Sequence, residues 1–111
     1  MKAVTKIVFI DEDGEKFFGE GPYRLLCLVE ETGSLHSASN TMGMAYTKAL
    51  KLLSNAEIAL GFKLTIRSVG GKQGGGSTLT PECKEWLKKY EDYRNACKKE
   101  NDKLYSEYFG K

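Results

Sequence analysis

The chain has 111 residues, of which 41% are hydrophobic and 29% charged, so we expect one globular domain with one core. No apolar run approaches the roughly 20 residues of a membrane span, and the N-terminus lacks the pattern of a secretory signal, so we expect a cytoplasmic protein without a membrane partner. The three cysteines form no C-x-x-C motif and there is a single histidine. We therefore expect free thiols, no metal site and no cofactor.

The net charge of +2 is distributed unevenly along the chain. Residues 1–42 carry a net −3, residues 43–80 a net +4 and residues 81–111 a net +1. The basic residues of the middle third are Lys48, Lys51, Lys63, Arg67 and Lys72. A polyanion would meet this part of the surface first.

The first predicted element is a β-hairpin. Residues Thr5 to Ile10 are mostly β-branched and aromatic, and Lys16 to Phe18 resume the apolar run after an acidic stretch, with a turn at Asp13-Gly14. A calcium-binding loop is the alternative for this acidic stretch. Its spacing, however, lacks the third ligand and the distal glutamate of such loops.

A helix is predicted next, with Pro22 at its first position, its end near Thr32 and Gly33 as its stop signal. Its apolar face consists of Leu25, Leu26, Leu28 and Val29. We expect this helix to support the two helices that follow it.

Residues 34–59 have the pattern of a helix-turn-helix. Ser34 is expected to cap a short helix, Gly43 to turn the chain, and a second helix to run from about Ala45 to about Ala59. Its inward stripe is predicted to be Ala49, Leu50, Leu53 and Ala56. Its other side and front end carry Tyr46, Thr47, Lys48, Lys51 and Asn55. A polar front with two lysines suits a helix that enters the major groove of DNA, although any αα-hairpin with solvated lysines would share the pattern.

A second hairpin is predicted after this helix. Phe62 to Arg67 alternate apolar and polar side chains, and Ser77 to Leu79 can form the return strand. The segment between them, residues 68–76, contains five glycines. Such a hairpin would be a wing, in which Arg67 and Lys72 supply charge to a phosphate backbone. A plain flexible loop is the alternative, whereas the pattern disfavours a P-loop because Lys72 comes before the last glycines and no lysine stands directly before Ser77.

The last predicted element is a long helix, capped by Thr80, opened by Pro81 and free of proline and glycine until Gly110. About 28 residues would extend over ~42 Å. Positions spaced by four and three residues form a coiled-coil seam, namely Cys83, Leu87, Tyr90, Arg94, Cys97, Asn101, Leu104 and Tyr108, broadened by Trp86, Tyr93 and Tyr105.

A domain of about 80 residues cannot cover this helix along its whole length, so the seam predicts a homodimer. The alternative, a helix folded over its own core, applies best to the first two turns near Trp86. The direction of pairing stays open, because Asn101 favours parallel helices and Arg94 tolerates antiparallel ones.

Two sets of motifs resemble known families of regulators. The helix-turn-helix resembles that of LysR-type regulators, in Thr32-Gly33-Ser34-Leu35, Ala38, Leu60-Gly61-Phe62-Lys63-Leu64 and Leu79-Thr80. A closer resemblance, over roughly residues 3–95, is to the DNA-binding domain of the molybdate-responsive ModE family. It rests on Phe18-Gly19-Glu20-Gly21, Glu31-Thr32-Gly33-Ser34, Met42-Gly43-Met44, Tyr46, Ala49, the wing residues 70–76 and Leu79-Thr80.

The resemblance implies a transcription regulator that is dimeric through its linker helices and binds a palindromic operator in double-stranded DNA. By position, the recognition contacts would come from Ala45, Tyr46, Thr47, Lys48 and Lys51, and the wing contacts from Arg67, Lys72 and Gln73. The dimer contacts would come from Leu87, Tyr90, Tyr93, Arg94, Cys97, Leu104 and Tyr108. Ala45 replaces the serine usual in the family, which weakens helix capping. The family's full-length regulators continue into a molybdate-binding domain, and we expect none in this chain, which ends at Lys111.

The predicted fold is therefore mainly α with small β: a winged helix-turn-helix domain over residues 1–80 and a linker or dimerisation helix over residues 81–111. The helix-turn-helix occupies about 34–59 and the wing about 63–79, after an N-terminal β-hairpin. We expect no enzyme, because one histidine and scattered carboxylates offer no acid, base and nucleophile together. A protein-interaction module on the same fold, without specific DNA readout, is the alternative function.

Overall fold

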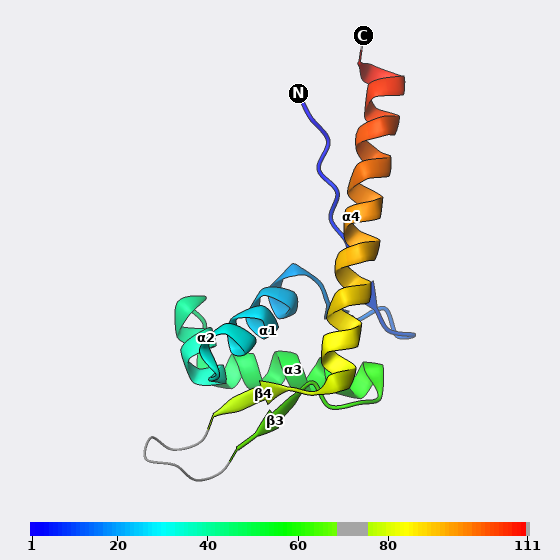
Figure 1. Cartoon of the computed structure of the whole chain (residues 1–111). Helices are drawn as coiled ribbons and strands as arrows, with labels where there is room; N and C mark the ends of the chain where they lie inside the picture. The colour runs from blue at the N-terminus through cyan, green and yellow to red at the C-terminus, as the bar shows by residue number, and fades with distance from the viewer. Residues whose placement is uncertain (69–75, 111) are drawn as a thin grey trace.

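The computed structural model describes residues 1–68 and 76–110. Its elements in chain order are β1 (Phe9–Ile10), β2 (Lys16–Phe18), α1 (Glu20–Thr32), α2 (Leu35–Thr41), α3 (Tyr46–Leu60), β3 (Thr65–Arg67), β4 (Ser77–Leu79) and α4 (Pro81–Phe109). The first three helices and the hairpins form a body from which α4 projects, and the molecule measures 60 × 29 × 25 Å (Figure 1). The predicted fold class, mainly α with two small antiparallel hairpins and a long C-terminal helix, is confirmed.

The N-terminal hairpin is shorter than predicted, since only Phe9 and Ile10 pair with β2 and the residues before them have no strand partner. Its turn is built as expected, with Gly14 at φ 83°. The carboxylate of Asp11 accepts hydrogen bonds from the amides of Asp13, at 2.9 Å, and Glu15, at 3.0 Å. One acidic side chain of the loop therefore has a structural role in the turn.

Helix α1 begins at Glu20, two residues before the predicted start, so Pro22 is its third residue. Proline is accepted there because the first four amides of a helix have no carbonyl partner within it. The helix ends at Gly33 as predicted, with φ 72° and an amide that donates to the carbonyl of Val29 at 2.8 Å.

The helix-turn-helix forms close to its predicted bounds. The Ser34 hydroxyl accepts from the amide of Ser37 at 3.0 Å and caps α2, and Gly43 turns the chain with φ 66°. Ala45 is the N-cap of α3 and supplies no side-chain acceptor, as expected. The predicted inward stripe is wrong at one position, because Leu50 is 41% exposed. Ala49, Leu53 and Ala56 alone, spaced by four and three residues, form the buried face of α3.

The core is a single cluster that includes the start of α4. Its buried residues are Phe18, Leu25, Leu26, Val29, Leu35, Ala38, Ala49, Leu53, Ala56, Leu64, Leu79, Cys83, Leu87 and Tyr90. The β1–β2 hairpin closes one side, where Phe18 makes edge contacts with Trp86 and Tyr90 at centroid distances of 5.4 and 5.0 Å. The predicted division into two parts at residue 80 stays a prediction. Helix α4 begins directly after this residue, and the core continues into it.

Helix α4 is built as predicted over 29 residues, with the Thr80 hydroxyl accepting from the amide of Cys83 at 3.0 Å. Tyr90 is the last buried residue within the described part of α4. Farther along, the N-terminal segment runs beside the helix, and Tyr105 donates to the carbonyl of Met1 at 2.9 Å (Figure 1). The C-terminal half of α4 is therefore accompanied by residues 1–8 rather than by the core.

Candidate nucleic-acid interface

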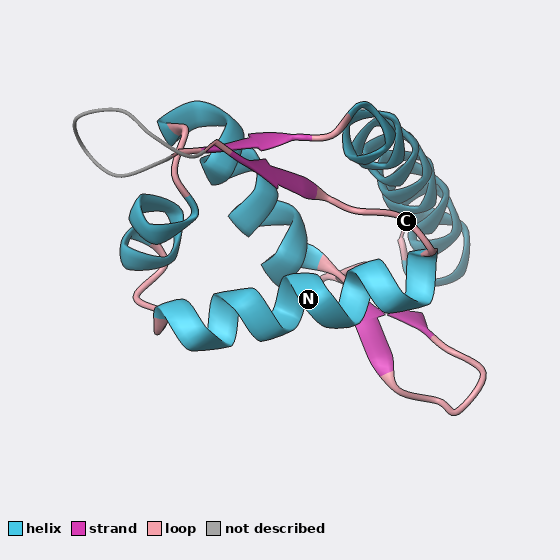
Figure 2. Ribbon diagram, turned by 90° about the horizontal axis from the view of Figure 1, so that it is seen from below, coloured by secondary structure: helices cyan, strands magenta, loops and turns pink. Residues whose placement is uncertain are grey.

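One long side of α3 is open to solvent. Seen from below, α3 lies in front, and the β3–β4 hairpin lies to one side of it with other helices between them in this view (Figure 2). The predicted contact residues Ala45, Thr47, Lys48 and Lys51 are all exposed there, and Tyr46 is half-buried. The structure thus brings all five predicted α3 residues to one end of one helix.

Tyr46 has two side-chain neighbours from other elements. Arg67, on β3, donates a hydrogen bond to the Tyr46 hydroxyl and lies 5.8 Å from the ring centroid. The ring of His36, from α2, lies 5.3 Å away by centroid distance. Two predicted contact residues, Tyr46 and Arg67, therefore meet, and they lock the start of α3 to β3. His36 was not predicted at this place, because only tertiary contact brings α2 against the tyrosine.

The base of the second hairpin is fixed at several points. Thr65, Ile66 and Arg67 pair with Leu79, Thr78 and Ser77, and the Ser77 amide donates to the carbonyl of Gly33 at 2.8 Å. Near the strand ends, the Ser68 amide donates to the carbonyl of Gly76 at 3.0 Å. These bonds tie β3 and β4 to the turn between α1 and α2. The predicted wing contacts Lys72 and Gln73 lie outside the described residues.

Glu57 is the only acidic residue between positions 43 and 80, and it has a structural role. Its carboxylate accepts from the Leu64 amide at 2.8 Å and lies 3.7 Å from the Lys63 ammonium group. The Glu57 carboxylate is therefore bound to residues at the junction of α3 and β3. This junction is at the opposite end of α3 from Lys48 and Lys51. Glu57 therefore does not neutralise the positive charges of Lys48 and Lys51, which can attract a negatively charged partner.

The residues predicted for dimerisation separate into two groups. Leu87 and Tyr90, 7% and 1% exposed, lie in the chain's own core, and Arg94 is bound to α1, so these three have partners within the chain. Tyr93, Leu104 and Tyr108 are exposed and Cys97 is half-buried. Dimerisation stays a prediction. Of the residues predicted for it, those of the second group are the ones that a second copy of the chain could contact in this structure.

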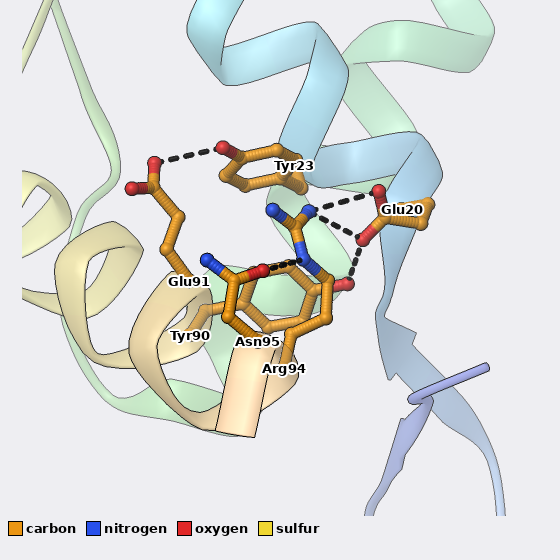
Figure 3. Close-up of polar contacts among 6 residues, drawn as sticks. All are labelled: Glu20, Tyr23, Tyr90, Glu91, Arg94 and Asn95. Carbon is orange, nitrogen blue, oxygen red and sulfur yellow. Dashed lines mark hydrogen bonds and ion pairs between the residues drawn. The ribbon is translucent and has the colours of Figure 1, made fainter. Parts of the chain in front are cut away.

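Arg94 joins the start of α1 to the middle of α4 (Figure 3). Its guanidinium donates to both carboxylate oxygens of Glu20 at 3.0 Å and lies 4.8 Å from the ring centroid of Tyr23, while Tyr90 also bonds to Glu20. Partial burial raises the pKa of the Glu20 carboxyl, but the hydrogen bonds from Tyr90 and Arg94 outweigh burial, and the net pKa is lowered.

The tyrosines and the buried thiol of this region are held neutral. Burial, helped by the hydrogen bond to Glu20, raises the pKa of Tyr90 to about 12. Burial raises the pKa of the Cys83 thiol to about 12 as well. Such a thiol is unreactive near neutral pH, which fits a core role for Cys83.

No helix within the described residues is long and apolar enough to cross a membrane. Taken together, α2 and α3 around the Gly43 turn, with β3 and β4 beside α3, define the class as a winged helix-turn-helix.

Part of the chain is similar in sequence to a known protein. The chain is 38% identical, over 65 residues, to the molybdenum transport protein ModE of Herbaspirillum seropedicae. The matched part is 59% of this chain and 24% of the relative, so the chain spans about a quarter of that protein. No family model matches the chain.

Proposed function

We propose that this chain is a sequence-specific DNA-binding regulator of transcription, with α3 in the major groove and the β3–β4 wing on the backbone or in the minor groove. The observation that carries the proposal is the open face of α3, on which Thr47, Lys48 and Lys51 are exposed beside the Tyr46–Arg67 pair. Partial similarity to a ModE protein and the resemblance to that regulator family support it.

In this proposal the roles divide by chemistry. Thr47 and Lys48 stand at the front of α3 and can donate or accept hydrogen bonds at base edges. Lys51 and Arg67 neutralise phosphates, and so does Lys72 from the wing, whereas Gln73 donates a hydrogen bond to the backbone. The roles of Lys72 and Gln73 are proposed from the sequence alone. Ala45 lets the backbone approach closely, and Tyr46 holds Arg67 in place.

Binding as a homodimer to a palindromic site is the second part of the proposal. The C-terminal part of α4 projects from the body (Figure 1). In this part Leu104 and Tyr108 are exposed and stand at seam spacing. A second copy of the chain would cover them. Its recognition helix would then lie about 34 Å from the first, or a multiple of that distance.

The salt dependence of binding tests the DNA contacts. Lys51→Ala and Lys72→Ala should each flatten the slope of log K against log salt by about 0.9, because each lysine is proposed to neutralise one phosphate. Fluorescence anisotropy on a duplex selected from a random pool measures the slope. Lys99→Ala, an exposed lysine on α4, is the matched control and should leave the slope unchanged.

Unchanged slopes for both variants would remove Lys51 and Lys72 from the interface. Selection that yields no preferred sequence, with binding abolished by moderate salt, would favour a protein-interaction module on the same fold and refute the proposed function.

A further inference from the structure

An exposed apolar side chain, Leu50, lies at the edge of the open face of α3, next to the buried stripe of Ala49 and Leu53. Leu50 is 41% exposed, one helical turn after Tyr46 and one turn before Ser54, which places it in the same row as both. Thr47 and Lys51 flank it and are exposed as well. On its exposed side the leucine therefore adjoins side chains proposed to contact DNA, and on its other side it adjoins the buried face of α3.

The position of Leu50 matters more than its exposure, because single exposed leucines are common on protein surfaces. Figure 2 shows that the face of α3 turned to the viewer has no other element over it. The row that contains Leu50 begins at Tyr46, which Arg67 and His36 hold in place. Leu50 therefore lies one turn along α3 from Tyr46, which contacts Arg67 of β3, and in the proposed complex this row of α3 would lie in the major groove.

The chemistry of the major groove offers such a side chain one specific partner. Among the four bases only thymine presents a methyl group there, and apolar side chains recognise it by contact. We propose that Leu50 is a specificity-determining residue that contacts the 5-methyl group of a thymine in the bound DNA. This inference rests on the proposed function and adds to it the identity of one base.

Replacing single thymines by deoxyuridine tests the contact, because it removes the methyl group and leaves the hydrogen-bonding edges unchanged. The probe is a duplex selected by the wild-type protein, with each thymine of one half-site replaced in turn. Burial of one methyl group contributes about 0.8 kcal/mol, which corresponds to about fourfold in Kd. We expect one replacement to weaken wild-type binding by about fourfold and to have no effect on Leu50→Ala.

Ile58→Ala is the matched control, since Ile58 is also on α3 and is 79% exposed, two turns farther from Tyr46. This variant should keep the wild-type response to deoxyuridine. Circular dichroism establishes that each variant is folded. Because the thymine and deoxyuridine duplexes are compared on the same variant, a general loss of affinity in that variant does not affect the ratio of the two Kd values.

Three outcomes would overturn the inference: selected sites without thymine in the half-site, no replacement that weakens the wild type, or an equal response in Leu50→Ala. In each of them the selected site itself still upholds the proposed function. Failure to select any sequence refutes the proposed function, and the Leu50 contact with it.

Discussion

At the scale of single residues, the ion pair between Glu20 and Arg94 joins the start of α1 to α4 just beyond the core. The pair connects the first residue of α1 with a residue one turn beyond the last buried position of α4. The Arg94 side chain is mostly covered, packed over the rings of Tyr23 and Tyr90, whereas the Glu20 side chain is about half exposed. Solvent therefore weakens the pair but does not remove it.

Glu20→Gln should lower the free energy of unfolding by about 1 kcal/mol at pH 7, since it removes the charge that two hydrogen-bond partners stabilise. The pKa of Glu20 is lowered in the folded state, so its contribution is present above the ordinary value of 4.5 and is lost as pH falls through the folded value. Urea unfolding at several pH values measures the difference. The two proteins should converge below pH 4.5.

Glu12→Gln is the control for this prediction, because Glu12 is an exposed carboxylate in the β1–β2 loop. It should change the free energy of unfolding by less than about 0.5 kcal/mol. A Glu20→Gln protein as stable as Glu12→Gln at neutral pH would show that the ion pair adds nothing to stability.

At the scale of elements, the β3–β4 hairpin depends on a close approach of two glycines. A side chain at Gly76 would place its Cβ 2.8 Å from the carbonyl oxygen of Gly33, at the turn between α1 and α2. The Ser77 amide bonds to that same oxygen at 2.8 Å. Only glycine therefore lets β4 approach the turn closely enough for this bond.

Gly76→Ala should displace β4 from the turn and weaken DNA binding several-fold, with a loss of about 1–2 kcal/mol in the free energy of unfolding. Gly21→Ala is the control, since its Cβ would meet nothing within 4 Å in the first turn of α1. That change should stabilise the protein by up to about 1 kcal/mol. Thermal unfolding and anisotropy measure both variants, and equal effects of the two would contradict the role of Gly76.

At the scale of the whole molecule, the C-terminal half of α4 is only partly covered by the rest of the chain. Residues 1–8 cover one strip of it through the Tyr105 and Asn101 contacts to the carbonyls of Met1 and Ala3. Leu104 and Tyr108 stay 44% and 75% exposed. A second copy would bury these side chains together with those of the neighbouring N-terminal segment.

If the dimer forms there, Leu104→Glu should shift the protein from dimer to monomer at micromolar concentration, because it places charges in the apolar interface. Sedimentation velocity measures the shift. Ser106→Glu adds the same charge at an exposed position farther round α4 and should leave the dimer intact. A wild-type monomer at micromolar concentration, or a Leu104→Glu protein that stays dimeric, would refute this interface.

The sequence by itself determined the elements of this protein, because their signals are local. Serine and threonine caps and stop glycines placed the four helices within two residues of their bounds, and the turn residues placed both hairpins, although β1 and β3 are shorter than predicted. It also located the basic front of α3. These features depend on backbone hydrogen bonds and side chains a few positions apart, which a sequence displays directly.

Only the tertiary structure decided which side chains face inward. Leu50 fits an apolar stripe by spacing, yet Ala49, Leu53 and Ala56 suffice for the core and leave it exposed. Arg94 fits a coiled-coil seam, yet Glu20 lies 74 positions away in the sequence and binds it. Whether such a side chain is buried or exposed depends on which distant parts of the chain pack against its helix. Helical periodicity does not contain that information.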